Sequence, residues 1–331
     1  MSARGRREAV LRLAALGAAA AAARPLFAAD AVDAERYPSR PIRMVVGSAA
    51  GTGDVIARLY ATRLADAWGQ PVVVENRPGA SYNIASDVVA RAPPDGYTIL
   101  WATSQITVTP TIVGPSVVDP VASFAPIAKV LVTPVFVFVH RSLGVATLPE
   151  LIALSRSRPL SYATGGLGSL PHLAMETILR RAGTAMVHVP YGNTGQAFAN
   201  FVSGEVPVYV SFYISVMAAL RDGTARAIAV ASDRRSPTFP DVPSVAELGY
   251  PEAAVEPWAG FAAPAGTPPA IVDKLHRELV RIMELPDTRE RYLQVGMDTV
   301  VSTPASMAAD IRRQTAAWPA IVKAAGVKVG P

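Results

Sequence analysis

The sequence predicts an α/β fold of two lobes, and three observations support this prediction. The chain has 331 residues, which is more than one hydrophobic core usually holds, so two domains are expected. β-Branched apolar runs alternate with stretches at helical spacing, a pattern typical of α/β layers with parallel sheets. The chain also leaves the first domain once, in the apolar run 127–139, and returns once near Glu256. Two crossings make a two-strand hinge, which suits closure of two lobes around a ligand.

The first domain opens with three elements in sequence. The run IRMVV at 42–46 predicts a strand, a glycine-rich loop follows at 47–53, and a helix is expected to begin at Asp54. The segment 71–100 predicts one compact βαβ unit, because two β-type stretches bracket a Pro-Gly turn, a short amphipathic helix and an Asp-Gly turn. A polar loop is expected at 103–105.

The second domain is expected to repeat this alternation. Its predicted helices are 148–156, 170–181, 195–202 and 216–221, and its predicted strands are 160–163, 186–189, 206–212 and 225–231. The run 234–251 contains too many prolines for a central strand and is expected on the surface. After a returning strand, helices are predicted from Pro268-Pro269 and from Pro304 to about residue 325.

The N-terminus predicts a secretory signal at residues 1–29. Arginines precede the apolar run 13–23, and small residues follow around Ala28, Ala29 and Ala31. The pair Arg6-Arg7 leaves twin-arginine export open beside the general pathway. An alanine-rich cytoplasmic helix is the alternative, but it leaves the apolar run without a partner. A periplasmic protein is therefore expected.

Charge and cysteine content narrow the function classes. Removal of residues 1–28 takes away five arginines and one acid, so the formal net charge falls from +5 to about +1. Because the mature sequence has no dense Lys/Arg run, no nucleic-acid partner is expected. The chain has no cysteine, which excludes disulfides, a lipid-anchor cysteine and thiolate chemistry.

Four loops are candidates for ligand binding, since ligands of parallel α/β sheets bind beyond the carboxyl ends of the strands. They lie at 47–54, 80–83, 103–104 and 164–169. Two of them are glycine-rich and feed helix N-termini, so facing loops would form a carboxylate clamp of main-chain donors without an arginine. Asp54 is either part of this site or a helix N-cap, and the same alternative holds for Asn83.

Enzymatic alternatives have weaker support. The main enzymatic alternative is a Rossmann-like nucleotide-dependent enzyme, but the spacing Gly47-x-x-x-Gly51-x-Gly53 differs from the dinucleotide fingerprint. No G-x-S-x-G motif is present, and Ser169 near His172 is interpreted as a helix-start serine beside a partly buried histidine. The histidines show no clear metal-ligand spacing. We therefore expect no catalytic residue, no metal and no cofactor.

The run VENRPGASYNIASDVVARAPPDGYT at 74–98 resembles the VENRPGA...PDGYT signature of the Bug-type solute receptors. These are the extracytoplasmic binding proteins of tripartite tricarboxylate transporters. The blocks YPSRPIRMVV, DVIARL, YATGGLGSLPHLAMETI, MVHVPYGNTG, SPTFPDVPSVAELGYP and FAAPAGTP are similar to family blocks as well. The resemblance extends from about Tyr37 to Lys328. The first loop departs from the family pattern, since GSAAGTG is one residue shorter and lacks prolines.

The resemblance implies a two-lobed type II periplasmic-binding-protein fold with a ligand cleft between the lobes. Lobe 1 would comprise 37–135 and 258–331, and lobe 2 would comprise 136–257. A monomer is expected to capture a small organic acid and deliver it to transporter subunits in the membrane; a sensor that presents its ligand to a signalling partner is the alternative. The expected ligand contacts are Gly51, Thr52, Gly53, Asp54, Ser81, Tyr82, Asn83, Thr103, Ser104, Gly166, Gly168, Ser169, Tyr191, Ser211 and Phe212.

Overall fold

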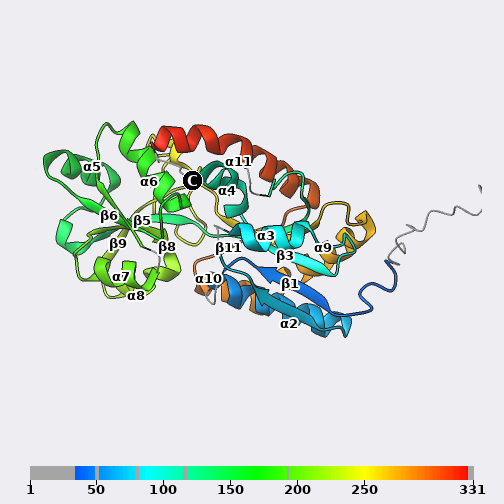
Figure 1. Cartoon of the computed structure of the whole chain (residues 1–331). Coiled ribbons are helices and arrows are strands. Elements are labelled where there is room, and N and C mark those ends of the chain that lie inside the picture. Colours follow the sequence, from blue (N-terminus) through cyan, green and yellow to red (C-terminus); the bar gives the residue numbers. More distant parts are fainter. Residues whose placement is uncertain (1–33, 49–51, 80–81, 115–117, 192–193, 327–331) are drawn as a thin grey trace, which may run out of the picture. The chain divides into compact units, whose positions relative to one another are not determined.

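Two β-sheets flanked by helices make up the described part of the chain in the computed structural model (Figure 1). Residues 34–48, 52–79, 82–114, 118–191 and 194–326 are described. By its internal contacts the chain divides into a segment ending at Tyr37 and a unit beginning at Pro38, and all that follows concerns this second unit. The predicted signal at 1–29 lies outside the described residues.

The first sheet has mixed strand directions. Its spatial order is β11 (Asp298–Thr299), β4 (Phe124–Val132), β10 (Trp258–Pro264), β3 (Thr98–Thr103), β1 (Ile42–Val46) and β2 (Val72–Asn76). β1 pairs in parallel with β2 and β3, whereas β10 runs antiparallel to both β3 and β4. The carboxyl ends of β1, β2 and β3 therefore lie at one edge of this sheet.

The second sheet is also mixed. Its order is β7 (Val187–Pro190), β6 (Ser161–Thr164), β8 (Val208–Phe212), β5 (Val135–His140) and β9 (Ala225–Val230). β6 pairs in parallel with β7 and β8, and β5 is antiparallel to β8 and β9. The carboxyl ends of β6, β7 and β8 share one edge.

The helices follow the strands in the alternation that the sequence predicts. They are α2 (Thr52–Trp68), α3 (Asn83–Ala90), α4 (Gln105–Val113), α5 (Leu148–Ser157), α6 (Leu170–Arg181), α7 (Thr194–Val202), α8 (Met217–Arg221), α9 (Pro269–Glu284), α10 (Pro286–Gln294) and α11 (Pro304–Ala325), with short 3₁₀ turns at Arg141–Leu143, Tyr213–Ser215 and Pro251–Ala253. α11 packs on β4 of the first sheet, on α4, which follows β3, and on α6, which follows β6 of the second sheet (Figure 1).

The chain passes between the sheets where β4 ends and β5 begins. Pro134 has no N–H group, so it ends the ladder of β4, and β5 then pairs in the other sheet. The returning segment lies beside the departing one, because the Thr133 amide donates to the Pro257 carbonyl at 2.8 Å. The predicted single run 127–139 is thus two strands in different sheets.

Each sheet has its own buried core. In the first sheet Trp101, Phe261 and Tyr60 form an aromatic cluster, with edge-on contacts of 5.0 Å between the ring centroids of Phe261 and each of the other two. In the second sheet the strands β5 and β8 are apolar on both faces and separate two clusters of buried side chains. Stability of this unit rests on these cores.

The structure corrects three local expectations. α2 begins at Thr52, two residues before the predicted Asp54, and the expected polar loop at 103–105 is the end of β3 followed by α4. The sheets are mixed, since β4, β5, β9 and β10 contribute antiparallel pairs. The lobe boundaries at 135/136 and 257/258 stay a prediction.

Candidate functional site

Asp54, predicted to bind ligand or cap a helix, lies inside the first turn of α2 rather than at its cap, and its carboxylate joins α2 to the end of β2. Its side chain is 9% exposed. One carboxylate oxygen accepts from Arg58 Nε at 2.9 Å and the other from Asn76 Nδ2 at 2.8 Å, and Asn76 Nδ2 also reaches the Ser48 carbonyl at 2.9 Å. The hydrogen bond from Arg58 is the main reason that the pKa of Asp54 lies below its usual range. Both Asp54 oxygens are therefore occupied by framework contacts.

Two hydroxyls without partners lie at the carboxyl ends of the central strands. β1 and β3 pair in register, Val46 beside Trp101, and Ser48 and Thr103 each follow two residues later. Ser48 Oγ and Thr103 Oγ1 are buried, and neither forms a hydrogen bond of ordinary geometry with any residue that the structure describes. Ser48 was not among the predicted contacts; its position relative to Thr103 becomes visible only with the register of the two strands.

Tyr82 lies against these two hydroxyls. Burial raises the pKa of the Tyr82 phenol, and the neighbouring hydroxyls of Ser48 and Thr103 partly offset this rise. Its backbone is left-handed, with φ of 73°, and it occupies the cap position of α3 without a capping side-chain bond. Such a conformation is strained for a bulky residue and is typical of functional loops. Ser48, Tyr82 and Thr103 thus form a polar cluster, which we call the hydroxyl cluster.

The other predicted contacts near the first sheet support the framework. Asn83 is the first residue of α3, and its Oδ1 accepts from the Val118 amide at 3.1 Å, so it does not cap the helix. Ser104 is 3% exposed, and its Oγ accepts from the Trp258 amide at 3.4 Å, which ties β3 to the start of β10. Gly53 lies in α2. A Cβ atom added at this glycine would lie 3.5 Å from Trp101 Nε1. Thr52 begins α2, while Gly51 and Ser81 lie outside the described residues.

The second glycine-rich loop follows β6 and feeds α6. Gly166 and Gly168 have φ of 149° and 71°, which side chains rarely adopt. The Gly166 amide donates to Thr164 Oγ1 at 3.2 Å and the Gly168 amide to His172 Nδ1 at 3.0 Å. Ser169 is the N-cap of α6, as the sequence predicts, with its Oγ donating to the Gly166 carbonyl at 2.8 Å. The amides of Gly166 and Gly168 are thus engaged within the loop.

The remaining predicted contacts belong to the second sheet. Tyr191 is 8% exposed; its amide donates to the Thr164 carbonyl at 3.0 Å, and its hydroxyl accepts from Asn200 Nδ2 at 2.7 Å. Ser211 is buried near the end of β8, and Phe212, the last residue of that strand, packs against a core cluster. These three residues, with the Gly165–Ser169 loop, lie at the carboxyl ends of β6, β7 and β8.

Contacts also link the two groups of loops. A Cβ built on Gly168 would lie 3.5 Å from Ile112 Cγ2, so the second glycine-rich loop lies beside α4, the helix that follows Thr103 and Ser104. Asp298 of β11 accepts from Ser236 Oγ at 3.2 Å and from Thr238 Oγ1 at 2.8 Å. The two halves of the unit are thus in direct contact.

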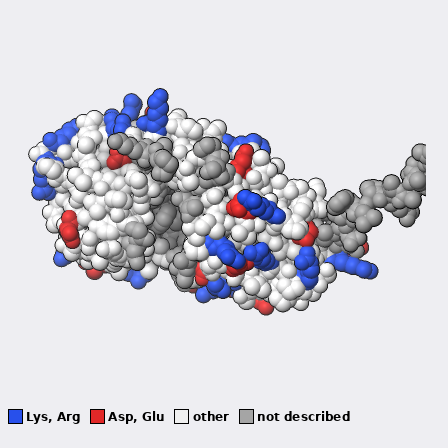
Figure 2. Space-filling view, in the orientation of Figure 1, with Lys and Arg blue, Asp and Glu red and all other residues white. Residues whose placement is uncertain are grey.

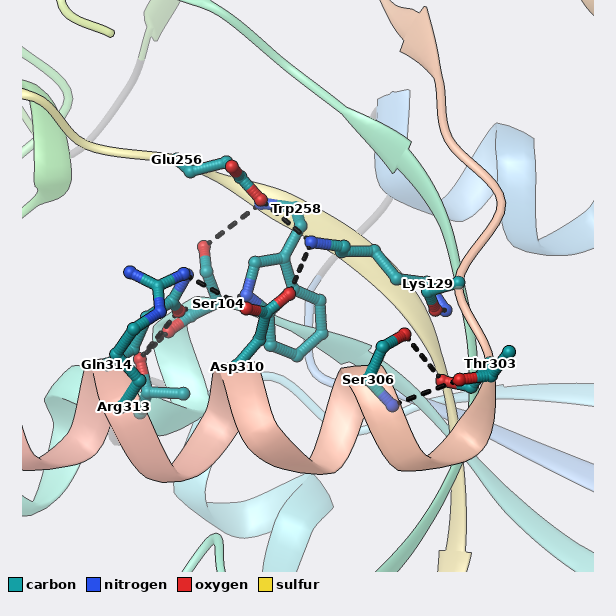
Figure 3. Close-up of polar contacts among 11 residues, drawn as sticks. Ser104, Lys129, Glu256, Trp258, Thr303, Ser306, Asp310, Arg313 and Gln314 are labelled. Atoms are coloured by element: carbon teal, nitrogen blue, oxygen red, sulfur yellow. Dashed lines mark hydrogen bonds and ion pairs between the residues drawn. The ribbon is translucent and has the colours of Figure 1, made fainter. Parts of the chain in front are cut away.

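Two cavities lie elsewhere in the unit. One of about 570 Å³ borders the crossing segments, and its lining includes Lys129, Glu256, Asp298 and Arg313; another of about 770 Å³ adjoins β9. Neither is lined by a predicted ligand contact. The Lys129 ammonium is already paired with Glu256 at 2.8 Å and with Asp310 at 2.7 Å (Figure 3). Because the hydroxyl cluster has free hydrogen-bonding capacity and these charges do not, the strand ends are the better candidate site.

Neither the surface charge nor the arrangement of metal-binding side chains indicates a second candidate site among the described residues. On the face drawn in Figure 2, basic and acidic side chains are interspersed. Among the described residues, no group of three or more His, Asp or Glu side chains is placed to hold a metal ion. None of the helices in the described ranges combines the length and hydropathy of a membrane span.

Comparison with known proteins assigns the family. The family described as "Tripartite tricarboxylate transporter family receptor" matches residues 56–327. Protein BugT of Bordetella pertussis is 35% identical over 306 residues, which are 90% of this chain and 93% of BugT. The structure of Rhodopseudomonas palustris Rpa4515 with adipate is 31% identical with a TM-score of 0.77, covering 88% of this chain and 99% of that one. MatC from Rhodopseudomonas palustris with bound malate is 29% identical with a TM-score of 0.72, covering 86% and 100%.

The structure of periplasmic binding protein BugD is 32% identical with a TM-score of 0.74, covering 88% of this chain and 99% of that one. The two sheets and this likeness define a periplasmic-binding-protein fold, so the predicted two-lobed fold class is confirmed. The chain belongs to the tripartite tricarboxylate transporter receptor family, as its sequence blocks indicate. This is a family of solute-binding receptors.

Proposed function

We propose that this protein is a periplasmic receptor that captures a small organic acid between two lobes and delivers it to a membrane transporter of the tripartite tricarboxylate type. Membership of the receptor family supports the class of function. Two relatives have been solved with carboxylic acids, adipate and malate, which supports a carboxylate as the ligand here. The mature chain would begin near residue 30 and act as a monomer.

The hydroxyl cluster carries the proposal. A buried hydroxyl without a hydrogen-bond partner costs about 1–3 kcal/mol relative to one that is hydrogen-bonded. Ser48 Oγ and Thr103 Oγ1 are two such groups, and both lie against the Tyr82 phenol just beyond the central strands. A carboxylate that accepts hydrogen bonds from both hydroxyls would remove this cost on binding.

The charges around the cluster indicate recognition by neutral donors. Arg58 is paired with Asp54 at 2.9 Å, and Arg77 is paired with Glu75. A carboxylate at the hydroxyl cluster would therefore be held by hydroxyl groups, the α2 N-terminus and main-chain donors, without a free guanidinium. Binding should then depend only weakly on ionic strength, since few mobile charges are neutralised.

The proposed mechanism uses both groups of loops. A ligand that contacts the strand ends of both lobes stabilises the conformation in which the lobes lie together, and the transporter would recognise that conformation. The sheet memberships support lobes of 37–135 with 258–331 and of 136–257, because strands β6 to β9 fall in the second range and β5 begins beside its boundary. The direct test is co-purification with transporter membranes, with and without ligand.

Thermal unfolding of the mature protein from about residue 30 tests the ligand class. The panel contains mono-, di- and tricarboxylates including malate and adipate, with aromatic acids, amino acids and nucleotides as competitors. A ligand at about 100 times its dissociation constant adds roughly 2.7 kcal/mol of stability. We expect a clear rise in Tm with one of the carboxylates; a response to nucleotides alone would overturn the proposal.

Removal of one hydroxyl tests the site itself. We expect Thr103→Val to weaken binding of the acid about tenfold, because one hydrogen bond to the carboxylate is lost, and to leave the stability of the free protein nearly unchanged. Thr315→Val is the matched control, since Thr315 Oγ1 is also buried without a partner but lies on α11. Titration calorimetry measures the affinity of both variants for the acid. Equal affinities of Thr103→Val and Thr315→Val would place the ligand away from the hydroxyl cluster.

A further inference from the structure

Two histidines that are distant in sequence are stacked beneath the second glycine-rich loop. His172 lies on α6 and His188 on β7, with ring centroids 3.8 Å apart and an angle of 12° between the ring planes. Tyr162 of β6 continues the stack, with its centroid 4.9 Å from that of His188. His172 is only 4% exposed. The contact is therefore a fixed part of the fold rather than a surface encounter.

Each ring holds a different part of the loop. His172 Nδ1 accepts the Gly168 amide hydrogen at 3.0 Å, so this nitrogen carries no proton in the described geometry. His188 Nε2 lies 2.8 Å from Thr164 Oγ1, and that hydroxyl in turn accepts from the Gly166 amide at 3.2 Å. The loop displays Leu167, 64% exposed, between the two glycines held in this way. The histidine pair thus holds the glycine-rich loop at both ends.

The surroundings of the pair keep both rings neutral. Burial lowers the pKa of His172 to about 4, and burial together with the neighbouring His172 lowers the pKa of His188 to about 4. Tyr162 is the ionisable group stacked against the rings. Its hydroxyl donates a hydrogen bond to the Glu176 carboxylate, which is the next ionisable group. Protonation of His172 at Nδ1 would put two N–H groups opposite one another, and it would charge a ring stacked on a second imidazole.

We propose that His172 and His188 are positioning residues, which hold the Gly165–Ser169 loop in its ligand-accepting shape while the Nδ1 of His172 carries no proton. The proposal rests on the proposed function, because this loop is one of the expected ligand contacts. It predicts that affinity for the acid is constant near neutral pH and falls as the pair takes up a proton, around pH 4.

The first test needs no ligand and uses two variants of one residue. In His172→Asn the amide Oδ1 can occupy the place of Nδ1 and accept the Gly168 hydrogen without titrating, whereas His172→Leu provides bulk but no acceptor. We expect exchange of the Gly168 amide hydrogen, followed by NMR, to be at least about tenfold faster in the leucine variant than in the asparagine variant. Equal exchange rates would overturn the positioning role.

The second test measures binding of malate and adipate by calorimetry from pH 8 to pH 3.5, and it compares wild type with variants at each pH because protonation of the acid itself is common to all of them. We expect His172→Leu to bind about tenfold more weakly than the wild type at pH 7.5, and His172→Asn to keep most of the affinity and a flatter acid limb. A merely structural role would lower Tm in both variants and leave both affinity profiles parallel to the wild type, which would refute the proposal. If the wild type binds neither acid, the receptor proposal fails for these ligands, and exchange at Gly168 still decides whether the histidines hold the loop.

Discussion

At the scale of single residues, Asp54 lies near the helix start that the sequence predicts, but its contacts differ from those expected of a helix cap. The sequence leaves two interpretations open, ligand contact and helix cap, because an aspartate at the end of a glycine-rich loop suits both. The structure adds a third, in which the carboxylate binds Arg58 one turn later and Asn76 at the end of β2. The second partner lies 22 residues away in the chain, so no local pattern indicates it.

We predict that Asp54→Ala lowers the free energy of unfolding by about 1–3 kcal/mol, because Asn76 and Arg58 each lose a hydrogen bond to a buried carboxylate. Asp87→Ala is the matched control: it removes an equivalent helical pair with Arg91, which is exposed, and should cost about 0.5 kcal/mol or less. Urea unfolding gives both values.

The pH dependence of Asp54 has a definite sign. Its pKa in the folded state is lowered, so its stabilisation is complete above the unfolded value of about 3.9 and is lost as the pH falls through the lower folded value. The stability difference between wild type and Asp54→Ala should therefore shrink below about pH 4. A difference that stayed constant down to pH 2 would show that the charge of Asp54 contributes nothing.

At the scale of elements, β10 could be predicted as a strand but not with its partners. The run at 258–264 is apolar and follows a proline-rich connection, which indicates a returning strand. Its antiparallel insertion between β3 and β4 depends on contacts with residues more than 100 positions earlier. α4 was missed for a related reason: QITVTPTIV is rich in β-branched residues and contains Pro110, and packing against α11 overrides these propensities.

We predict that Gly260→Ala costs at least about 2 kcal/mol, because the close approach of β10 and β4 leaves no room for a methyl group. A Cβ at this position would lie 2.1 Å from the Ala128 carbonyl oxygen. Gly165→Ala is the control, since its nearest neighbour is 3.9 Å away and its φ is unremarkable. Thermal unfolding of the two variants should differ clearly; equal Tm values would mean that β4 yields easily.

At the scale of the whole unit, a buried cation joins three segments that are distant in sequence. Lys129 of β4 is 7% exposed at its side chain and pairs with Glu256 of the returning segment and Asp310 of α11. Figure 3 shows its ammonium directed toward both carboxylates, with Arg313 on the far side of Asp310. The three segments meet where the chain passes between the sheets.

We predict that Lys129→Ala lowers the free energy of unfolding by about 3 kcal/mol, because Asp310 and Glu256 lose a buried partner. Arg313→Ala removes the exposed partner of the same Asp310, 66% exposed, and should cost less than about 1 kcal/mol. Chemical denaturation measures the free energy of unfolding of both variants. Equal losses in the two would mean that burial of Lys129 does not strengthen its ion pairs.

The sequence by itself determined the alternation of strands and helices, the N-cap at Ser169, the two crossings near Pro134 and Glu256, and the family, because these depend on local patterns and ordered motifs. Only the tertiary structure decided the mixed strand directions, the partners of Asp54, the meeting of Ser48 and Thr103 at Tyr82, and the stacking of His188 on His172. These features depend on pairs of segments brought together by sheet formation. A local pattern specifies which face of an element is buried, but the partner that covers it is set by packing across the whole chain.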